Sequence, residues 1–286
     1  MTSRERVINA FEFKPVDAVP VEFHPSPSGF YEHGEKLRNL LYELPCDFEE
    51  CRNNPITYPE PKNIMPDGSY HAFETDEWGV GWELRIFGIM GHPYRRPLDD
   101  LSYLKDYKFP SVPYDDPAEF ESMCRSVKQN KKNWYVKRGA FPMFQKMLAL
   151  RKYEDVLMDI MDDTEEINYI ADQIAGMIEK YIDYYAKAGV DAFAFFDDFG
   201  TANDLIMSKD VWTSFFGKRY SRLIKRAKDH GMKTVFHSCG QVSKIIDDLR
   251  RMGVDAIWPQ LAVYDLKQLA DHCRDIGLAA ALHIDR

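Results

Sequence analysis

The segment His237-Ser238-Cys239-Gly240 holds a pair of side chains suited to binding a metal ion. Residues two apart on a β-strand point to the same side, so the imidazole of His237 and the thiol of Cys239 can reach one ion. Zinc binds nitrogen at about 2.0–2.1 Å and sulfur at about 2.3 Å, and a catalytic zinc site has three protein ligands and one open position. Judged from spacing alone, an inert buried cysteine beside a hydrogen-bonded histidine is the commoner arrangement. The spacing therefore allows a zinc site. The sequence indicates two of its ligands, His237 and Cys239, and does not indicate the third.

The pair Asp197-Asp198 is the second feature that could do chemistry, because carboxylates act as general acids and bases. Neighbouring residues on a strand face opposite sides, so at most one carboxylate would point into a site and the other would cap a helix or loop. An alternative of equal weight is that both carboxylates only cap a loop and take no part in chemistry. Trp78 is an aromatic candidate for a ligand cleft, although ordinary packing is the commoner role. Other polar groups stand at the ends of expected strands or just after them: Glu22, His24, Asn203, Gln260, His283 and Asp285.

The elements that position these residues follow one pattern, repeated four times from about residue 163: an amphipathic helix, a glycine, and an apolar strand with a polar end. The expected helices span about 163–189, 208–231, 242–253 and 266–276, each followed by a strand. Strands that are apolar on both faces and separated by helices belong to a parallel sheet, whose carboxyl ends carry the reactive groups. With residues 19–24 and 134–138 the sequence shows six strands, whereas a closed barrel has eight. A doubly wound sheet or a (β/α)8 barrel fits the pattern.

Residues 55–115 interrupt this pattern with a stretch rich in proline and glycine. Pro93, Pro97 and Pro110 disfavour helices there, and residues 76–83 are typical of a short antiparallel hairpin. We expect an irregular insertion that serves as a lid or flank within a single domain, residues 1–286.

Composition excludes several classes of protein. The 286 residues are 45% hydrophobic and carry a net charge of -9, without a basic cluster, which disfavours nucleic acid and anionic membranes as partners. Five cysteines in no regular spacing indicate reduced thiols and a cytoplasmic protein. No segment is predicted to span a membrane. The sequence also lacks a glycine-rich phosphate loop and a Gly-x-Ser-x-Gly motif, which disfavours nucleotide-binding and serine-hydrolase functions.

The sequence resembles the uroporphyrinogen decarboxylase superfamily, especially its branch of corrinoid-dependent methyltransferases. The resemblance rests on residues 4–7 and 15–20, Asp76-Glu77-Trp78-Gly79, Phe196-Asp197-Asp198-Phe199-Gly200 and Phe236-His237-Ser238-Cys239-Gly240. It implies a TIM-type (β/α)8 barrel and a methyltransferase that moves a methyl group between a methylated corrinoid and a thiol or tetrahydrofolate acceptor. The corrinoid would be free methylcobalamin or bound to a partner protein. Because the branch carries zinc on a His-x-Cys motif, the resemblance strengthens His237 and Cys239 as zinc ligands.

Within this resemblance we expect specific roles for several residues. The expected catalytic residues are Asp197, Asp198 and His237, and the expected cofactor-binding residues are His24, Trp78, Asn203 and Gln260. The family brings its third zinc cysteine from later strands, whereas this chain ends at Arg286. The barrel is therefore expected to be truncated at its C-terminus or closed in another way, and Glu22, His24, His283 or Asp285 could replace the cysteine. An exposed sheet edge would favour pairing into a homo-oligomer.

Two alternative functions stay open. One is a decarboxylase of the porphyrin pathway, but the arginines that grip the substrate carboxylates after the first strand are absent here until Arg38. The other is a non-catalytic module that binds a corrinoid or tetrapyrrole.

Overall fold

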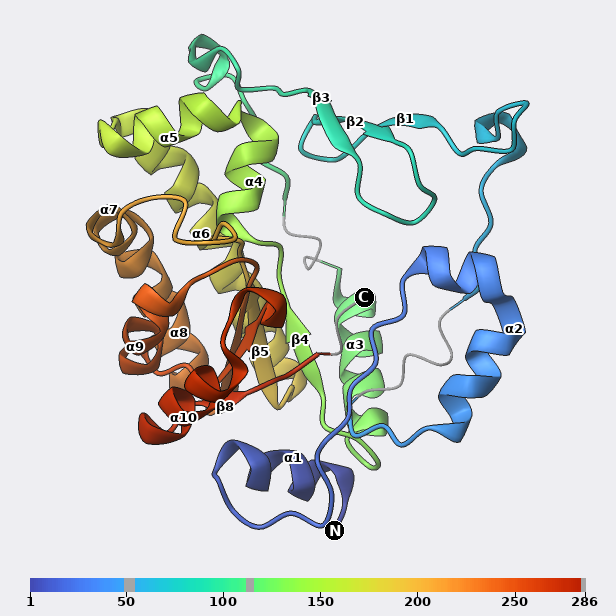
Figure 1. The fold of residues 1–286 in the computed structure, drawn as a ribbon. Coiled ribbons are helices and arrows are strands. Elements are labelled where there is room, and N and C mark those ends of the chain that lie inside the picture. The colour runs from blue at the N-terminus through green and yellow to red at the C-terminus, as the bar shows by residue number, and fades with distance from the viewer. Residues whose placement is uncertain (49–54, 112–115, 284–286) are drawn as a thin grey trace.

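A five-stranded parallel sheet forms the centre of the molecule (Figure 1). The computed structural model describes residues 1–48, 55–111 and 116–283. The strands lie in chain order: β4 (Lys137–Gly139), β5 (Ala192–Phe196), β6 (Lys233–Ser238), β7 (Ala256–Pro259) and β8 (Ala279–Ala280). At least one helix connects each strand to the next, which is the connection that parallel strands require. The predicted α/β class with a parallel sheet is confirmed.

The expected closed barrel of eight strands is not formed by the described residues, because their parallel sheet is open and has five strands. Residues 19–24, predicted as the first strand, form no strand. Pro20 has no N–H to donate to a ladder. Val21 is held instead by Asp47, whose backbone N–H donates to the Val21 carbonyl and whose carboxylate accepts from the Val21 N–H, both at 2.9 Å. The sixth predicted strand is reduced to the two residues of β8.

Helix α6 (Glu165–Ala188) is the longest helix of the described residues, and it packs through a stripe of apolar side chains. The stripe includes Ile167, Ile170, Ile174, Ile178 and Ile182, all buried. Gly189 ends the helix in the left-handed conformation, φ 86°, as predicted. The helix begins after Thr164, whose side chain caps it by accepting from the N–H of Ile167.

The second predicted helix is interrupted. Ser208 caps it as expected, but α7 (Lys209–Trp212) passes through a π-helical turn, Thr213–Gly217, into α8 (Lys218–Asp229). The hydroxyls of Thr213 and Ser214 donate to carbonyls of the preceding turn, which competes with the regular helical bonds. The third and fourth predicted helices are confirmed as α9 (Ser243–Met252) and α10 (Leu266–Asp275).

The two faces of the parallel sheet have different neighbours. One face packs against helices, and Phe193, Phe195, Phe236 and Ile257 lie on it. The opposite face, here termed the inner face, carries Ala194, Val235 and Ala256. Because side chains alternate along a strand, His237 lies on the inner face with Val235. Its ring centre is 4.7 Å from that of Trp258 on β7.

The insertion forms a separate antiparallel sheet of three strands: β1 (Ala72–Thr75), β2 (Gly81–Leu84) and β3 (His92–Arg95). The predicted hairpin is therefore present and is extended by β3, an edge strand in which Pro93 is tolerated. Residues 55–111 contain only short 3₁₀ turns, Pro61–Asn63 and Leu101–Tyr103, as helical structure. Figure 1 shows this sheet beside α4 (Met143–Leu150) and α5 (Tyr153–Met161).

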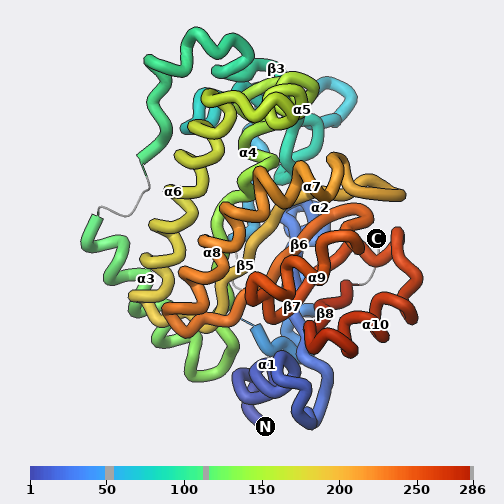
Figure 2. Tube along the Cα trace, turned by 90° about the vertical axis from the view of Figure 1, so that its left-hand side faces the viewer, coloured from blue at the N-terminus to red at the C-terminus, as the bar shows by residue number. Residues whose placement is uncertain are grey.

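Three further helices complete the described chain: α1 (Ser3–Phe11), α2 (Pro27–Glu43) and α3 (Pro117–Asn130). Helix α1 lies at one end of the molecule in both views (Figures 1 and 2). There Arg4 forms an ion pair with the buried carboxylate of Asp191 at 2.9 Å, just before β5. The amino ends of the strands are thus covered, and the opposite ends remain for the polar residues. Among the described residues, no helix is both long and apolar enough to cross a membrane.

Candidate functional site

Asp198, His237 and Cys239 come together at the carboxyl ends of β5 and β6. The parallel register pairs Phe196 with His237, so Asp198 and Cys239 are neighbours two residues further along. Nε2 of His237 lies 3.6 Å from Sγ of Cys239 and 3.8 Å from Oδ1 of Asp198. The three donor atoms lie within 4.8 Å of one another, and each residue is partly exposed. Two of the three residues are the pair that the sequence predicted as metal ligands.

Backbone hydrogen bonds hold the two strand ends at this spacing. The N–H of Asp197 donates to the carbonyl of His237 at 3.0 Å. The N–H of Cys239 donates to Oδ1 of Asp198 at 2.9 Å. The side chain of Asp198 is therefore held by the main chain of Cys239.

The environment of His237 prepares its ring for metal binding. Nδ1 lies 2.8 Å from the carbonyl oxygen of Trp258. Because a carbonyl can only accept, Nδ1 carries the proton and Nε2 keeps its lone pair. Burial lowers the pKa of His237, which favours the neutral ring that binds metals. Metal-ligating histidines commonly donate their second N–H to such an acceptor.

The two donor separations measured from His237 fit a tetrahedral zinc ion. Zinc bond lengths place neighbouring nitrogen, oxygen and sulfur ligands roughly 3.5 Å apart. The observed separations from Nε2 of His237 are 3.6 and 3.8 Å. One imidazole, one thiol and one carboxylate are also ligand types that zinc accepts. These residues could therefore hold a zinc ion and leave a fourth position for substrate.

Asp198 is the third candidate donor at this site, a position that the sequence left open. Among the earlier candidates, Glu22 is engaged by Nζ of Lys137 at 2.6 Å. His283 accepts from the indole N–H of Trp258 at 3.1 Å. Asp285 lies outside the described residues. The sequence does show that Asp198 and Cys239 each follow the end of a strand. Predicting that the two residues are neighbours also requires the register of the two strands.

Asp197 points away from this cluster, as expected for neighbours on a strand. Its carboxylate is 1% exposed and accepts from the N–H groups of Phe144 at 2.7 Å and Gln145 at 3.1 Å. The hydroxyl of Tyr220 donates to it at 2.6 Å. Burial raises the pKa of Asp197 to about 7, although these three donors favour its charged form. Asp197 thus caps the first turn of α4, the role predicted for one of the two aspartates.

Trp258 joins His237 to the segment that precedes α2. The rings of His24 and Trp258 stack with centres 5.3 Å apart. Nζ of Lys137 lies 5.5 Å from the Trp258 ring centre. The sequence analysis identified Gln260 as a site residue but missed Trp258, two residues earlier, because Trp258 was counted among the apolar residues of its strand. His24, a predicted cofactor-binding residue, is therefore close to the candidate metal ligands.

Two glycines allow the loops after β5 and β6 to approach closely. A Cβ on Gly240 would overlap the backbone of Gly200, and Gly240 also has a φ of 73°. The N–H of Gly240 donates to Oε1 of Gln260 at 2.8 Å. The Gln260 side chain, predicted to bind a cofactor, therefore holds the loop that carries Cys239.

The structure does not bring Trp78 and Asn203 into the cluster. Trp78 is 2% exposed and packs in the core. Nζ of Lys146 lies 4.6 Å from its ring centre. Asn203 is exposed in the turn after β5, where its N–H donates to the Thr201 hydroxyl at 3.3 Å. Their predicted role as cofactor ligands has no support from these positions.

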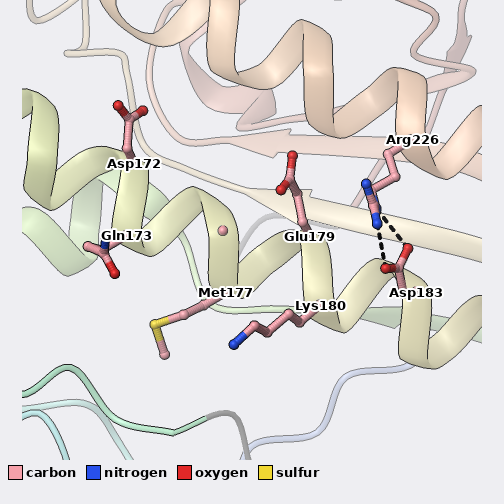
Figure 3. A pocket seen from close by; sticks show the side chains of 8 residues that line it. Asp172, Gln173, Met177, Glu179, Lys180, Asp183 and Arg226 are labelled. Carbon is pink, nitrogen blue, oxygen red and sulfur yellow. Dashed lines mark hydrogen bonds and ion pairs between the residues drawn. The ribbon is translucent and has the colours of Figure 1, made fainter.

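A cavity of about 340 Å³ lies elsewhere, along α6 and α8. Figure 3 shows that α6 supplies most of its lining, with the Arg226–Asp183 ion pair at one end. No residue from the ends of the strands lines it. The cavity is therefore separate from the candidate metal centre.

Comparisons with known proteins agree with the sequence motifs. Residues 138–279 match the model of the uroporphyrinogen decarboxylase (URO-D) family. Comparison with curated proteins found no match. Among solved structures, a methyltransferase from Methanosarcina mazei is similar, with a TM-score of 0.57 and 16% identity over 98% of this chain and 82% of that chain. At this identity the likeness concerns the fold. The match over residues 138–279 covers the motifs at 196–200 and 236–240 and confirms the resemblance to the uroporphyrinogen decarboxylase superfamily.

Proposed function

We propose that this chain is a methyltransferase that moves a methyl group between a methylated corrinoid and a thiol or tetrahydrofolate acceptor. The observation that carries the proposal is the convergence of Asp198, His237 and Cys239 within 4.8 Å. The family match and the likeness in fold to a methyltransferase support it. The corrinoid would arrive as free methylcobalamin or on a partner protein.

The three residues would hold zinc through Nε2 of His237, Sγ of Cys239 and a carboxylate oxygen of Asp198. A zinc ion held by these residues would supply Lewis acidity and favour the thiolate form of a thiol substrate, the form that attacks carbon. The lone pair of the acceptor then attacks the methyl carbon, and the electron pair of the cobalt–carbon bond stays with cobalt. The Trp258 carbonyl keeps His237 in the required tautomer throughout.

With a tetrahydrofolate acceptor, we propose that Asp198 orients the acceptor and handles its proton. Its side chain is 38% exposed, whereas that of Asp197 is buried. We therefore assign substrate contact to Asp198. Asp197 would support it without contacting the substrate. We propose that His24, whose ring stacks on that of Trp258, contacts the corrinoid.

The direct test is to measure the zinc content of the purified protein and then methylcobalamin demethylation with each acceptor. We expect about one zinc per chain, and we expect His237→Ala and Cys239→Ala to lose both zinc and thiol methylation. Full thiol methylation by metal-free variants at both positions would disprove the zinc mechanism. Tight corrinoid binding without turnover of any methyl donor would instead favour a non-catalytic binding module.

A decarboxylase is the second candidate, because the matching family model is that of uroporphyrinogen decarboxylase. The segment after residue 24 has no arginine before Arg38, which forms an ion pair with Glu35 at 2.8 Å. Incubation with uroporphyrinogen and product analysis separates the two functions, and we expect no loss of carboxylate groups. Cytoplasmic location and self-association stay predictions from the sequence.

A further inference from the structure

The carboxylate of Asp197, the residue before Asp198, accepts three hydrogen bonds. Two donors are backbone N–H groups in the first turn of α4, at Phe144 and Gln145. The third is the hydroxyl of Tyr220, a residue of α8 that is 0% exposed. A buried carboxylate requires such donors, because its desolvation is costly without them.

The backbone of Asp197 is linked to the candidate metal ligands. Its backbone N–H donates to the carbonyl of His237 at 3.0 Å, and its peptide bond leads directly to Asp198. Asp198 in turn accepts from the N–H of Cys239. A shift of Asp197 therefore moves Asp198 relative to His237, and zinc ligation tolerates bond-length errors of only about 0.2 Å.

We propose that Asp197 and Tyr220 are positioning residues that hold Asp198 at ligating distance from His237 and Cys239. This inference rests on the proposed function, since it concerns the metal centre of that function. Neither residue is one of the three candidate donors, so on this proposal the affinity for metal depends on a hydroxyl group contributed by α8. Partners of this kind typically change metal affinity by about 10–100-fold when they are removed.

The test is the affinity of the metal-free protein for Co²⁺, followed by the visible absorption of the bound ion. We expect Tyr220→Phe to raise the Kd about 10–100-fold and to change the ligand-field absorption. Tyr135→Phe is the matched control, because Tyr135 is 1% exposed and its hydroxyl donates to the carbonyl of Asp191 at 3.4 Å, before β5. We expect this control to keep the Kd and the spectrum of the wild type.

A double-mutant cycle separates positioning from general loosening of the fold. If Tyr220 acts through Asp198, Tyr220→Phe raises the Kd in the wild-type background but changes it less than about twofold in an Asp198→Asn background. An equal loss in both backgrounds, or no loss in either, overturns the inference and leaves the proposed function intact. A wild-type protein that binds neither Co²⁺ nor Zn²⁺ overturns both. Should Tyr220→Phe fail to fold, Asp197→Asn replaces it in the same cycle.

Discussion

The ring of His24 stacks on the indole of Trp258, with centres 5.3 Å apart and planes inclined by 21°. Trp258 also contacts the ring of His237, 4.7 Å away. The segment before α2 thus reaches the inner face of the sheet at the place where the candidate metal ligands lie. This contact gives the N-terminal part of the chain a direct route to influence the site.

Replacing His24 tests whether the stacked ring contacts the methyl donor. The side chain is 54% exposed, so a ligand can reach it. We expect His24→Ala to raise the KM for methylcobalamin up to about tenfold, the scale of one lost aromatic contact, with unchanged zinc content. His33→Ala on α2, where the side chain is 64% exposed, is the control. Equal KM values for both variants would argue against a ligand contact at His24.

Replacing Cys239 tests the thiol as a metal ligand. In Cys239→Ser a hydroxyl takes the place of the thiolate, and we expect zinc content to fall from about one ion per chain to below roughly a tenth. Elemental analysis after dialysis measures this. Cys124→Ser, at a half-buried cysteine of α3, should retain the zinc of the wild type. Retention of zinc by Cys239→Ser would remove the thiol from the ligand set.

The close approach of Gly240 and Gly200 predicts a large effect of one methyl group. Because a Cβ at Gly240 meets the Gly200 backbone and the φ is 73°, we expect Gly240→Ala to lower the free energy of unfolding by about 2 kcal/mol or more. Gly176→Ala in α6 is the control, since a Cβ there has open space around it. That change should raise stability by about 0.5–1 kcal/mol. Urea denaturation measures both changes in the free energy of unfolding. A small change for Gly240→Ala would show that the two loops can move apart.

The buried Asp197 predicts a pH dependence of stability. Its pKa is about 7 in the folded protein, above the ordinary aspartate value of 3.8, because burial favours the neutral acid. The raised pKa means that this stabilisation is complete below pH 4 and is lost as the pH rises to about 7. The free-energy difference between wild type and Asp197→Asn should therefore shift by up to about 4 kcal/mol in favour of the variant over that range. Urea denaturation from pH 4 to 8 measures it, and a constant difference contradicts the raised pKa.

Much of the fold could be predicted from local patterns. The spacing of apolar residues in 163–189, and the glycine that ends it, predict α6 and its end because both are properties of a single helix. The same holds for α9 and α10. Alternation along β6 placed His237 and Cys239 on one side for the same reason.

Other features depend on residues that are distant in the chain. The sequence by itself determined α6, α9 and α10, the strands β5 to β7 and the pairing of His237 with Cys239, because each follows from the period of one element. Only the tertiary structure decided that Asp198 is the third donor, since the register of β5 against β6 sets its distance. It also decided that residues 19–24 stay outside the sheet, because their backbone binds Asp47 instead of a strand. Register and burial are properties of packed neighbours, and no local pattern contains them.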